Sequence, residues 1–160
     1  MSRRSVPGYL GVLMHSVSAR QYDGAMALQV LVYSDDITVR RKVIQGIGAR
    51  PDSALPPLEF VEVATGPMVI ERLAAPGSLP GIDLAILDGE ATPFGGMGVA
   101  KQVKDEVDAP PPIVILTGRP QDNWLASWSR AEAVVPRPID PMRLTATVID
   151  LLGSAAASRR

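Results

Sequence analysis

The stretch Leu84-Ala-Ile-Leu-Asp88 decides the fold, because four apolar residues run directly into a single carboxylate. A short apolar run without alternation is typical of a strand that is buried on both faces of a sheet. Strands of this kind belong to parallel sheets covered by helices, in which ligands bind beyond the carboxyl ends of the strands. Asp88 is therefore expected at the functional edge of an α/β domain.

Other apolar segments predict the remaining strands. They cover residues 28–33, 58–64, 113–116 and 133–135. Amphipathic segments separate them, so that strands and helices alternate along the chain. This alternation predicts the α/β class, with a doubly wound five-stranded parallel sheet, right-handed crossovers and helices on both faces.

Capping residues mark the expected helices. Asp36 is a good N-cap and Gly48 a good stop signal for a helix over residues 37–47. Ile37, Ile44 and Ile47 fall on the apolar face of that helix. Further helices are predicted from Pro67, across Val99, Val103 and Val107 after a loop over residues 89–96, through Trp124 and Trp128, and from Asp140 and Pro141 to Leu152.

The predicted domain covers residues 28–152, and the chain on either side is expected to lie outside its core. Residues 1–27 read as an N-terminal extension, with Met26 as an alternative natural start. Two arginines before a short apolar stretch loosely resemble a secretory signal, but the stretch is broken by glycine and soon followed by histidine and arginine. Residues 153–160 are expected to form a frayed tail.

Composition narrows the classes of function. The 160 residues are 46% hydrophobic, which is typical of one globular domain. The formal net charge of −1 offers no basic excess for DNA binding. No apolar run approaches the ~18 residues that span a bilayer, so direct membrane insertion is not expected. The chain has no cysteine, which excludes disulfides and thiolate chemistry and fits a cytoplasmic protein.

Polar residues stand where the predicted strands end, and the carboxyl ends of parallel strands share one edge of the sheet. These residues are Ser34, Asp35 and Asp36 after the first strand, Asp88 at the third, Thr117 at the fourth, and Arg137 and Pro138 after the fifth. Carboxylates bind Mg²⁺, while a cation and a hydroxyl stabilise anionic oxygens. The set suits a site for phosphoryl chemistry.

The order and spacing of these residues resemble the receiver domains of two-component response regulators, over residues 28–152. The segment 30–41 and the turn Phe94-Gly-Gly96 follow the same rhythm. The resemblance implies a flavodoxin-like receiver (βα)5 topology. It also implies a regulatory protein and not an enzyme, with a histidine kinase or another protein as partner.

The resemblance assigns roles to individual residues. Asp88 matches the aspartate that accepts a phosphoryl group, and Asp35 matches the second acid of the pair that binds Mg²⁺. Thr117 matches the hydroxyl residue that ends the fourth strand. Pro138 matches a proline whose preceding peptide bond is usually cis. In the family, the backbone carbonyl at the position of Glu90 reaches the metal, and the Glu90 side chain could add a negative charge there or block access.

Three positions depart from the family pattern. Ser34 stands in place of the first acid, so one carboxylate for Mg²⁺ is missing, whereas Asp36 should point away and cap the following helix. Arg137 replaces the usual lysine, and its wide planar fork could pair bidentately with Asp88. Val134 lies near the position of a switching aromatic residue.

Trp124 and Trp128 are four residues apart on a short predicted helix, so they share one face. Inward packing is expected for one of them. The corresponding region of receivers binds partners, and exposed tryptophans are good anchors for a protein interface. Trp124 and Trp128 are therefore interpreted as partner-binding residues.

Two hypotheses for the function stay open. In the first, the chain is a stand-alone receiver that is phosphorylated on Asp88 with Mg²⁺ and signals through protein contacts. In the second, it is a degenerate receiver that acts without phosphorylation, as a docking module or a stable accessory subunit of a larger assembly. A small hydrolase or a nucleotide- or flavin-binding enzyme of similar topology is disfavoured, because no glycine-rich phosphate loop follows the first strand.

Overall fold

The computed structural model describes residues 21–22, 25–75, 81–119 and 123–158. Its main sheet has five parallel strands in the order β4-β3-β5-β6-β7. The strands are β3 (Leu28–Tyr33), β4 (Leu58–Val63), β5 (Leu84–Asp88), β6 (Ile113–Thr117) and β7 (Ala133–Pro136). The predicted α/β class and doubly wound sheet are confirmed.

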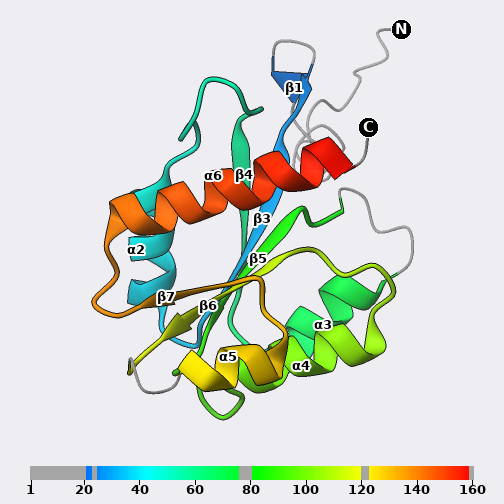
Figure 1. The fold of residues 1–160 in the computed structure, drawn as a ribbon, viewed down its shortest axis with the longest axis vertical. Coiled ribbons are helices and arrows are strands. Elements are labelled where there is room, and N and C mark those ends of the chain that lie inside the picture. Colours follow the sequence, from blue (N-terminus) through cyan, green and yellow to red (C-terminus); the bar gives the residue numbers. More distant parts are fainter. Residues whose placement is uncertain (1–20, 23–24, 76–80, 120–122, 159–160) are drawn as a thin grey trace, which may run out of the picture.

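Within the described residues, five helices cover the sheet, and Figure 1 shows them in two layers. They are α2 (Ile37–Ile47), α3 (Gly66–Ala74), α4 (Gly96–Glu106), α5 (Asn123–Ser129) and α6 (Pro141–Ser158). α2 and α6 lie together on one face, and α3, α4 and α5 lie on the other. None of these helices is long and apolar enough to cross a membrane.

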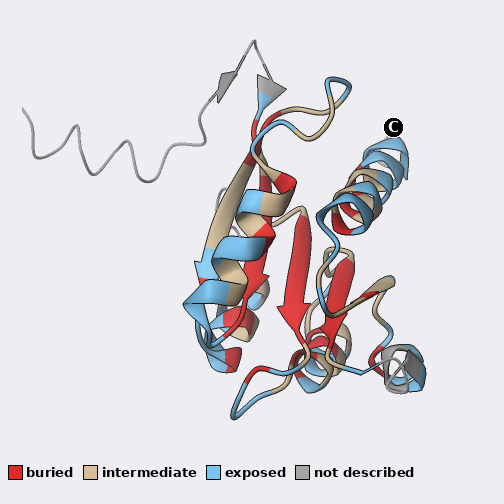
Figure 2. Cartoon of the chain, turned by 90° about the vertical axis from the view of Figure 1, so that its left-hand side faces the viewer, coloured by how far each residue is buried: buried red, intermediate tan, exposed pale blue. Residues whose placement is uncertain are grey.

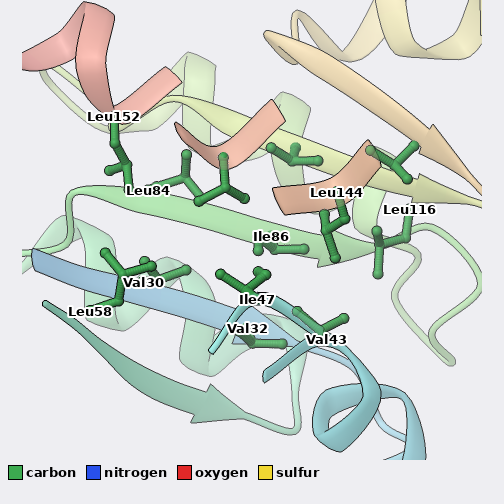
Figure 3. Close-up of a cluster of buried hydrophobic side chains, with 13 residues drawn as sticks. Val30, Val32, Val43, Ile47, Leu58, Leu84, Ile86, Leu116, Leu144 and Leu152 are labelled. Carbon is green, nitrogen blue, oxygen red and sulfur yellow. The ribbon is translucent and has the colours of Figure 1, made fainter. Parts of the chain in front are cut away.

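The strands alternate their side chains between the two helical layers. On β5, Leu84 and Ile86 join the apolar cluster under α2 and α6 (Figure 3), whereas Ala85 and Leu87 join the cluster under α3 and α4. Because both faces are buried, the inner strands need the continuous apolar runs seen in the sequence (Figure 2). By the same alternation, Asp88 follows Leu84 and Ile86 on the α2 and α6 side.

Capping residues mark the start of α2 and of α6, as predicted. The Asp36 carboxylate accepts from the backbone N–H of Thr38 at 2.8 Å, and the Asp140 carboxylate accepts from that of Met142 at 2.9 Å. Gly48 ends α2 with a φ of 74°, a conformation that glycine adopts without strain. The predicted apolar face of α2 is only partly right, because Ile37 is exposed, Ile44 is half-buried and the buried residues are Val43 and Ile47.

Two features differ from the sequence-based expectation. Within the predicted N-terminal extension, β1 (Gln21–Tyr22) and β2 (Ala25–Met26) pair antiparallel as a small separate sheet. The frayed tail is wrong for residues 153–158, because α6 continues through Gly153 to Ser158. A single glycine costs a helix only about 1 kcal/mol, and the three alanines that follow are strong helix formers.

The packing of α6 on the sheet is testable through Leu144, which is completely buried beside Ile86 and Leu116. We expect Leu144→Ala to lower the free energy of unfolding by about 2–5 kcal/mol, because it removes buried methyl groups and leaves a cavity. Urea unfolding measures the change. Met142→Ala on the same helix is the control, since Met142 is 83% exposed and its loss should cost less than about 0.5 kcal/mol. Equal losses in the two variants would contradict this docking of α6.

Candidate functional site

The candidate site lies where β3, β5, β6 and β7 end. Tyr33 and Leu87 are register partners, so the next residues, Ser34 and Asp88, face each other across β3 and β5. Thr117 is partnered with Pro136 across β6 and β7, which brings Arg137 to the same edge. The parallel sheet thus gathers Ser34, Asp88, Thr117 and Arg137 as the sequence predicted.

The Asp88 carboxylate is buried, with 2% of the residue exposed, and donors engage both of its oxygens. Oδ2 accepts from the Ser34 hydroxyl at 2.7 Å. Oδ1 accepts from the Glu90 backbone N–H at 2.9 Å and from Nη2 of Arg137. A buried carboxylate without such partners would be costly, so these three donors are what allow the charge to lie here.

Arg137 directly follows the carboxyl end of β7, and its side chain extends from there to Asp88. Its backbone N–H donates to the Thr117 carbonyl at 2.8 Å, and its peptide bond to Pro138 is cis, as the resemblance implies. The predicted bidentate pairing is not formed, because one guanidinium nitrogen meets one carboxylate oxygen. The Arg137 Nε is buried and has no hydrogen-bond partner, although the side chain as a whole is 28% exposed.

Hydrogen bonds fix both the hydroxyl and the backbone carbonyl of Ser34. Its hydroxyl accepts from the Asp36 backbone N–H at 3.0 Å while donating to Asp88. Its carbonyl accepts from Nη1 of Arg40 at 2.7 Å, and Arg40 is in turn paired with Glu62 at 3.0 Å. The residue that replaces an acid is thus a positioned donor to Asp88, a role that sequence reasoning did not assign to it.

The loop after β5 is fastened to the end of β3 by two further hydrogen bonds. The Asp35 carboxylate is exposed and accepts from the Thr92 hydroxyl at 3.0 Å. The buried Tyr33 hydroxyl donates to the Phe94 carbonyl at 2.5 Å. Burial, and then the charges of Asp35 and Asp88, raise the pKa of Tyr33 above its ordinary value, so this donor stays protonated.

The predicted metal ligands are in contact with other groups of the protein in this arrangement. Asp35 is engaged by Thr92, and Asp88 by its three donors. The Glu90 side chain lies against Gly118, where an added Cβ would overlap its carboxylate. Within the described residues, no group of three or more His, Asp or Glu side chains is placed to hold a metal ion. A bound Mg²⁺ would have to replace some of the hydrogen bonds that engage Asp35 and Asp88 here.

Thr117 contributes a buried hydroxyl to the site. The residue is fully buried at the end of β6, and its Oγ1 has no hydrogen-bond partner. A buried polar atom without a partner is unusual and often marks a functional position. Val134, near the position of the family's switching aromatic, is partly buried on β7.

Both tryptophans of α5 are exposed, so the expected inward packing of one of them is wrong. Trp124 is 67% exposed and Trp128 is 49% exposed. The ammonium of Lys101 on α4 lies 5.6 Å from the centroid of the Trp128 ring and makes a cation–π contact with this one of the two tryptophans. The α5 surface therefore presents a large aromatic area to solvent.

The dependence of Asp88 on Arg137 is testable by a double-mutant cycle. We expect Arg137→Met to lower the free energy of unfolding by about 2 kcal/mol, because it leaves a buried carboxylate with one donor fewer while water reaches the partly exposed position. Asp88→Asn with Arg137→Met should lose less than the sum of the single variants, as urea unfolding would show. Additive losses would mean that Arg137 does not stabilise the Asp88 charge.

The comparisons with known proteins agree with this geometry. No protein-family model matches the chain. The uncharacterized response regulatory proteins of two Mycobacterium tuberculosis strains, MT3230 of CDC 1551 / Oshkosh and Rv3143 of ATCC 25618 / H37Rv, are each 58% identical over 134 residues. Each match covers 84% of this chain and 98% of the relative.

Solved structures show the same fold at lower identity. The signal receiver domain of a LuxO repressor protein from Vibrio parahaemolyticus has a TM-score of 0.68 at 22% identity, covering 84% of this chain and 96% of that one. A CheY-like receiver domain protein from Methanospirillum hungatei JF-1 has a TM-score of 0.66 at 14% identity, covering 82% and 98%. The sheet order, the strand-end residues and the close relatives together show that this chain belongs to the response-regulator receiver family of two-component signalling.

Proposed function

We propose that this protein is a regulatory receiver that works without phosphorylation, with Asp88 held in one state by Arg137 and Ser34. The observation that carries the proposal is that donors already engage both carboxylate oxygens of a residue that is 2% exposed. Its output would be contact with a partner protein, as a docking module or an accessory subunit in the cytoplasm.

The chemistry of phosphoryl transfer supports this choice. For Asp88 to accept a phosphoryl group, one carboxylate oxygen must attack phosphorus in line, with cations neutralising the added oxygens. Arg137 occupies Oδ1 with a charge that it cannot lose, and Ser34 occupies Oδ2. Together with the Glu90 backbone N–H, these donors occupy three of the roughly four lone-pair sites of the carboxylate, so an incoming phosphoryl group would have to compete with them.

A second candidate function is the phosphoacceptor switch itself, in which a histidine kinase phosphorylates Asp88. One observation favours it: the Thr117 Oγ1 and the Arg137 Nε are both buried without a partner. Two idle donors near Asp88 could bind oxygens of a phosphoryl group. Receivers generally bind Mg²⁺ at this site, and here Asp35, Asp88 and Glu90 would have to rearrange to hold it.

Intact-protein mass spectrometry decides between the two. We expect no added phosphoryl group when the full chain is incubated with acetyl phosphate and Mg²⁺, because Arg137 and Ser34 block Asp88. The variant Ser34→Asp/Arg137→Lys restores the family's acid and lysine, and it should gain one phosphoryl group that depends on Mg²⁺.

The controls keep this experiment decisive. Adding Asp88→Asn to the restored variant should abolish its gain, which assigns the phosphoryl group to Asp88. If the unaltered chain gains a phosphoryl group that Asp88→Asn removes, the phosphoacceptor function stands and the proposed one does not. Circular dichroism before the reaction checks that each variant is folded.

We further propose that Trp124 and Trp128 anchor the partner protein. Together they expose aromatic area on one short helix, and large aromatic side chains contribute most to protein interfaces. Neither is needed for the core, since both are among the exposed large hydrophobic residues. Their place on α5 also matches the region that the family uses for contacts.

Photo-crosslinking in the native cell tests this surface. A photoreactive phenylalanine derivative in place of Trp124 should give one dominant crosslinked protein, because an anchor residue lies at the centre of its interface. The same derivative in place of Met142, which is 83% exposed on α6, is the matched control. Crosslinks of the same product from both positions, or from Met142 alone, would rule out α5 as the anchor.

A further inference from the structure

A groove lies behind the candidate site, between α2 and the segment that joins β7 to α6. Its volume is about 530 Å³, and its walls are largely apolar, with Val39 from α2 facing Pro138, Ile139 and Pro141. Grooves of roughly 300–1,000 Å³ with apolar walls and a few polar groups are typical of small-molecule sites.

The charged residues that line the groove are both cations. Lys42 is exposed on α2 and makes no ion pair with any described residue, and Arg137 contributes from the end of β7. None of the described lining residues is acidic. Two acids flank the lining residues in the sequence, Asp140 and Asp36, and the charge of Asp36 interacts with Arg137. Their carboxylates cap the N-termini of α6 and α2, and neither residue lines the groove. The groove is therefore complementary to an anion.

Arg137 belongs to both the groove and the Asp88 site. Nη2 donates to Asp88, while Nε is buried with no partner and the side chain keeps 28% exposure. The planar guanidinium has five N–H donors and prefers bidentate contact with a carboxylate. An anion in the groove could therefore compete with Asp88 for the partly exposed Arg137 side chain, and would draw the guanidinium away from Asp88.

The N-terminal segment is a poor occupant of this groove on grounds of charge. Residues 1–20 contain three arginines and no acid. This segment would be repelled by Lys42 and Arg137. The occupant that matches the groove is a separate small molecule with an anionic head and an apolar body.

We propose that this groove binds a small carboxylate with an apolar body, whose head lies between Lys42 and Arg137, and that binding weakens the contact between Arg137 and Asp88. The coupling rests on the proposed function, because it takes the Arg137–Asp88 pair as the resting state. Linkage makes the effect reciprocal: whatever weakens the pair must strengthen binding in the groove by the same factor.

The test uses 4-phenylbutanoate and its neutral partner 4-phenylbutanamide, titrated into the ¹⁵N-labelled full chain and followed by NMR. A probe of this size should bind with a Kd on the order of 1 mM. We expect saturable shifts of the Lys42, Gly46 and Ile139 amides and of the Arg137 Nε–Hε signal with the carboxylate, and at least several-fold weaker binding of the amide. Equal binding of the two probes, or no saturable shift in the groove, overturns the proposal.

Matched variants separate binding from coupling. Lys42→Gln should weaken carboxylate binding roughly five-fold, the effect of losing one exposed ion pair. Arg41→Gln should leave it unchanged, because the neighbouring Arg41 does not line the groove. A similar loss in both variants would point to general charge attraction and would overturn the site.

The coupling has its own readout. Asp88→Asn removes the competitor for Arg137, so it should tighten carboxylate binding several-fold and enhance the shift of the Arg137 Nε–Hε signal. Unchanged affinity in Asp88→Asn would overturn the coupling. The acetyl phosphate experiment judges the proposed function separately, since it makes no use of the groove.

Discussion

The arrangement of the strand ends depends on one buried carboxylate, that of Asp88. Asp88 lies at the end of a fully buried strand, where its charge is stable only if donors replace the water that it has lost. The donors come from three places in the sequence: Ser34 after β3, Arg137 after β7, and the backbone of Glu90 beside Asp88 itself. The hydrogen bonds that stabilise the Asp88 carboxylate therefore connect the ends of β3, β5 and β7 at one edge of the sheet.

Serine in place of the family's first acid and arginine in place of its lysine have the same effect, because each supplies a donor to the Asp88 carboxylate. With serine at position 34, the edge has one negative charge fewer and gains a hydroxyl donor that reaches Asp88. With arginine at position 137, a long permanent cation reaches Oδ1 across β6. The serine and the arginine thus both donate to Asp88, where the family pattern has a metal-binding acid and a lysine.

Sequence patterns were sufficient to predict those elements that depend on a repeated burial pattern or on interactions within one turn of the chain. The apolar runs that end in Tyr33, Asp88 and Thr117 predicted three strands, because strands buried on both faces must be apolar throughout. Asp36 and Gly48 predicted the ends of α2, because caps act within one turn. Gly153 was misleading, since its low helix propensity is outweighed by the helix-forming residues around it.

The site was harder to predict because its contacts are tertiary. The sequence predicted that Asp88 and Arg137 meet, but only the path of the chain after β7 shows that one guanidinium nitrogen makes the contact. The bond from Ser34 could have been inferred from strand parity, since Ser34 follows Val30 and Val32 on the face that Asp88 shares. The contacts of Asp35 with Thr92 and of Tyr33 with Phe94 carried no signal, because the shape of the loop after β5 determines them.

The position of Arg137 also changes how a signal could leave the site. In the family, a strand-end hydroxyl and an aromatic residue on the fifth strand move together, but Val134 offers no aromatic ring to follow Thr117. Arg137 instead connects Asp88 directly to Pro138, Ile139 and the N-terminus of α6, which pack beside α2. A change in the Arg137–Asp88 contact would therefore first alter the groove between α2 and the start of α6, which Arg137 lines. This groove is on the face of the sheet opposite to α5. Contacts at the exposed tryptophans and events at Asp88 thus involve different surfaces, and a partner held by α5 need not depend on the state of Asp88.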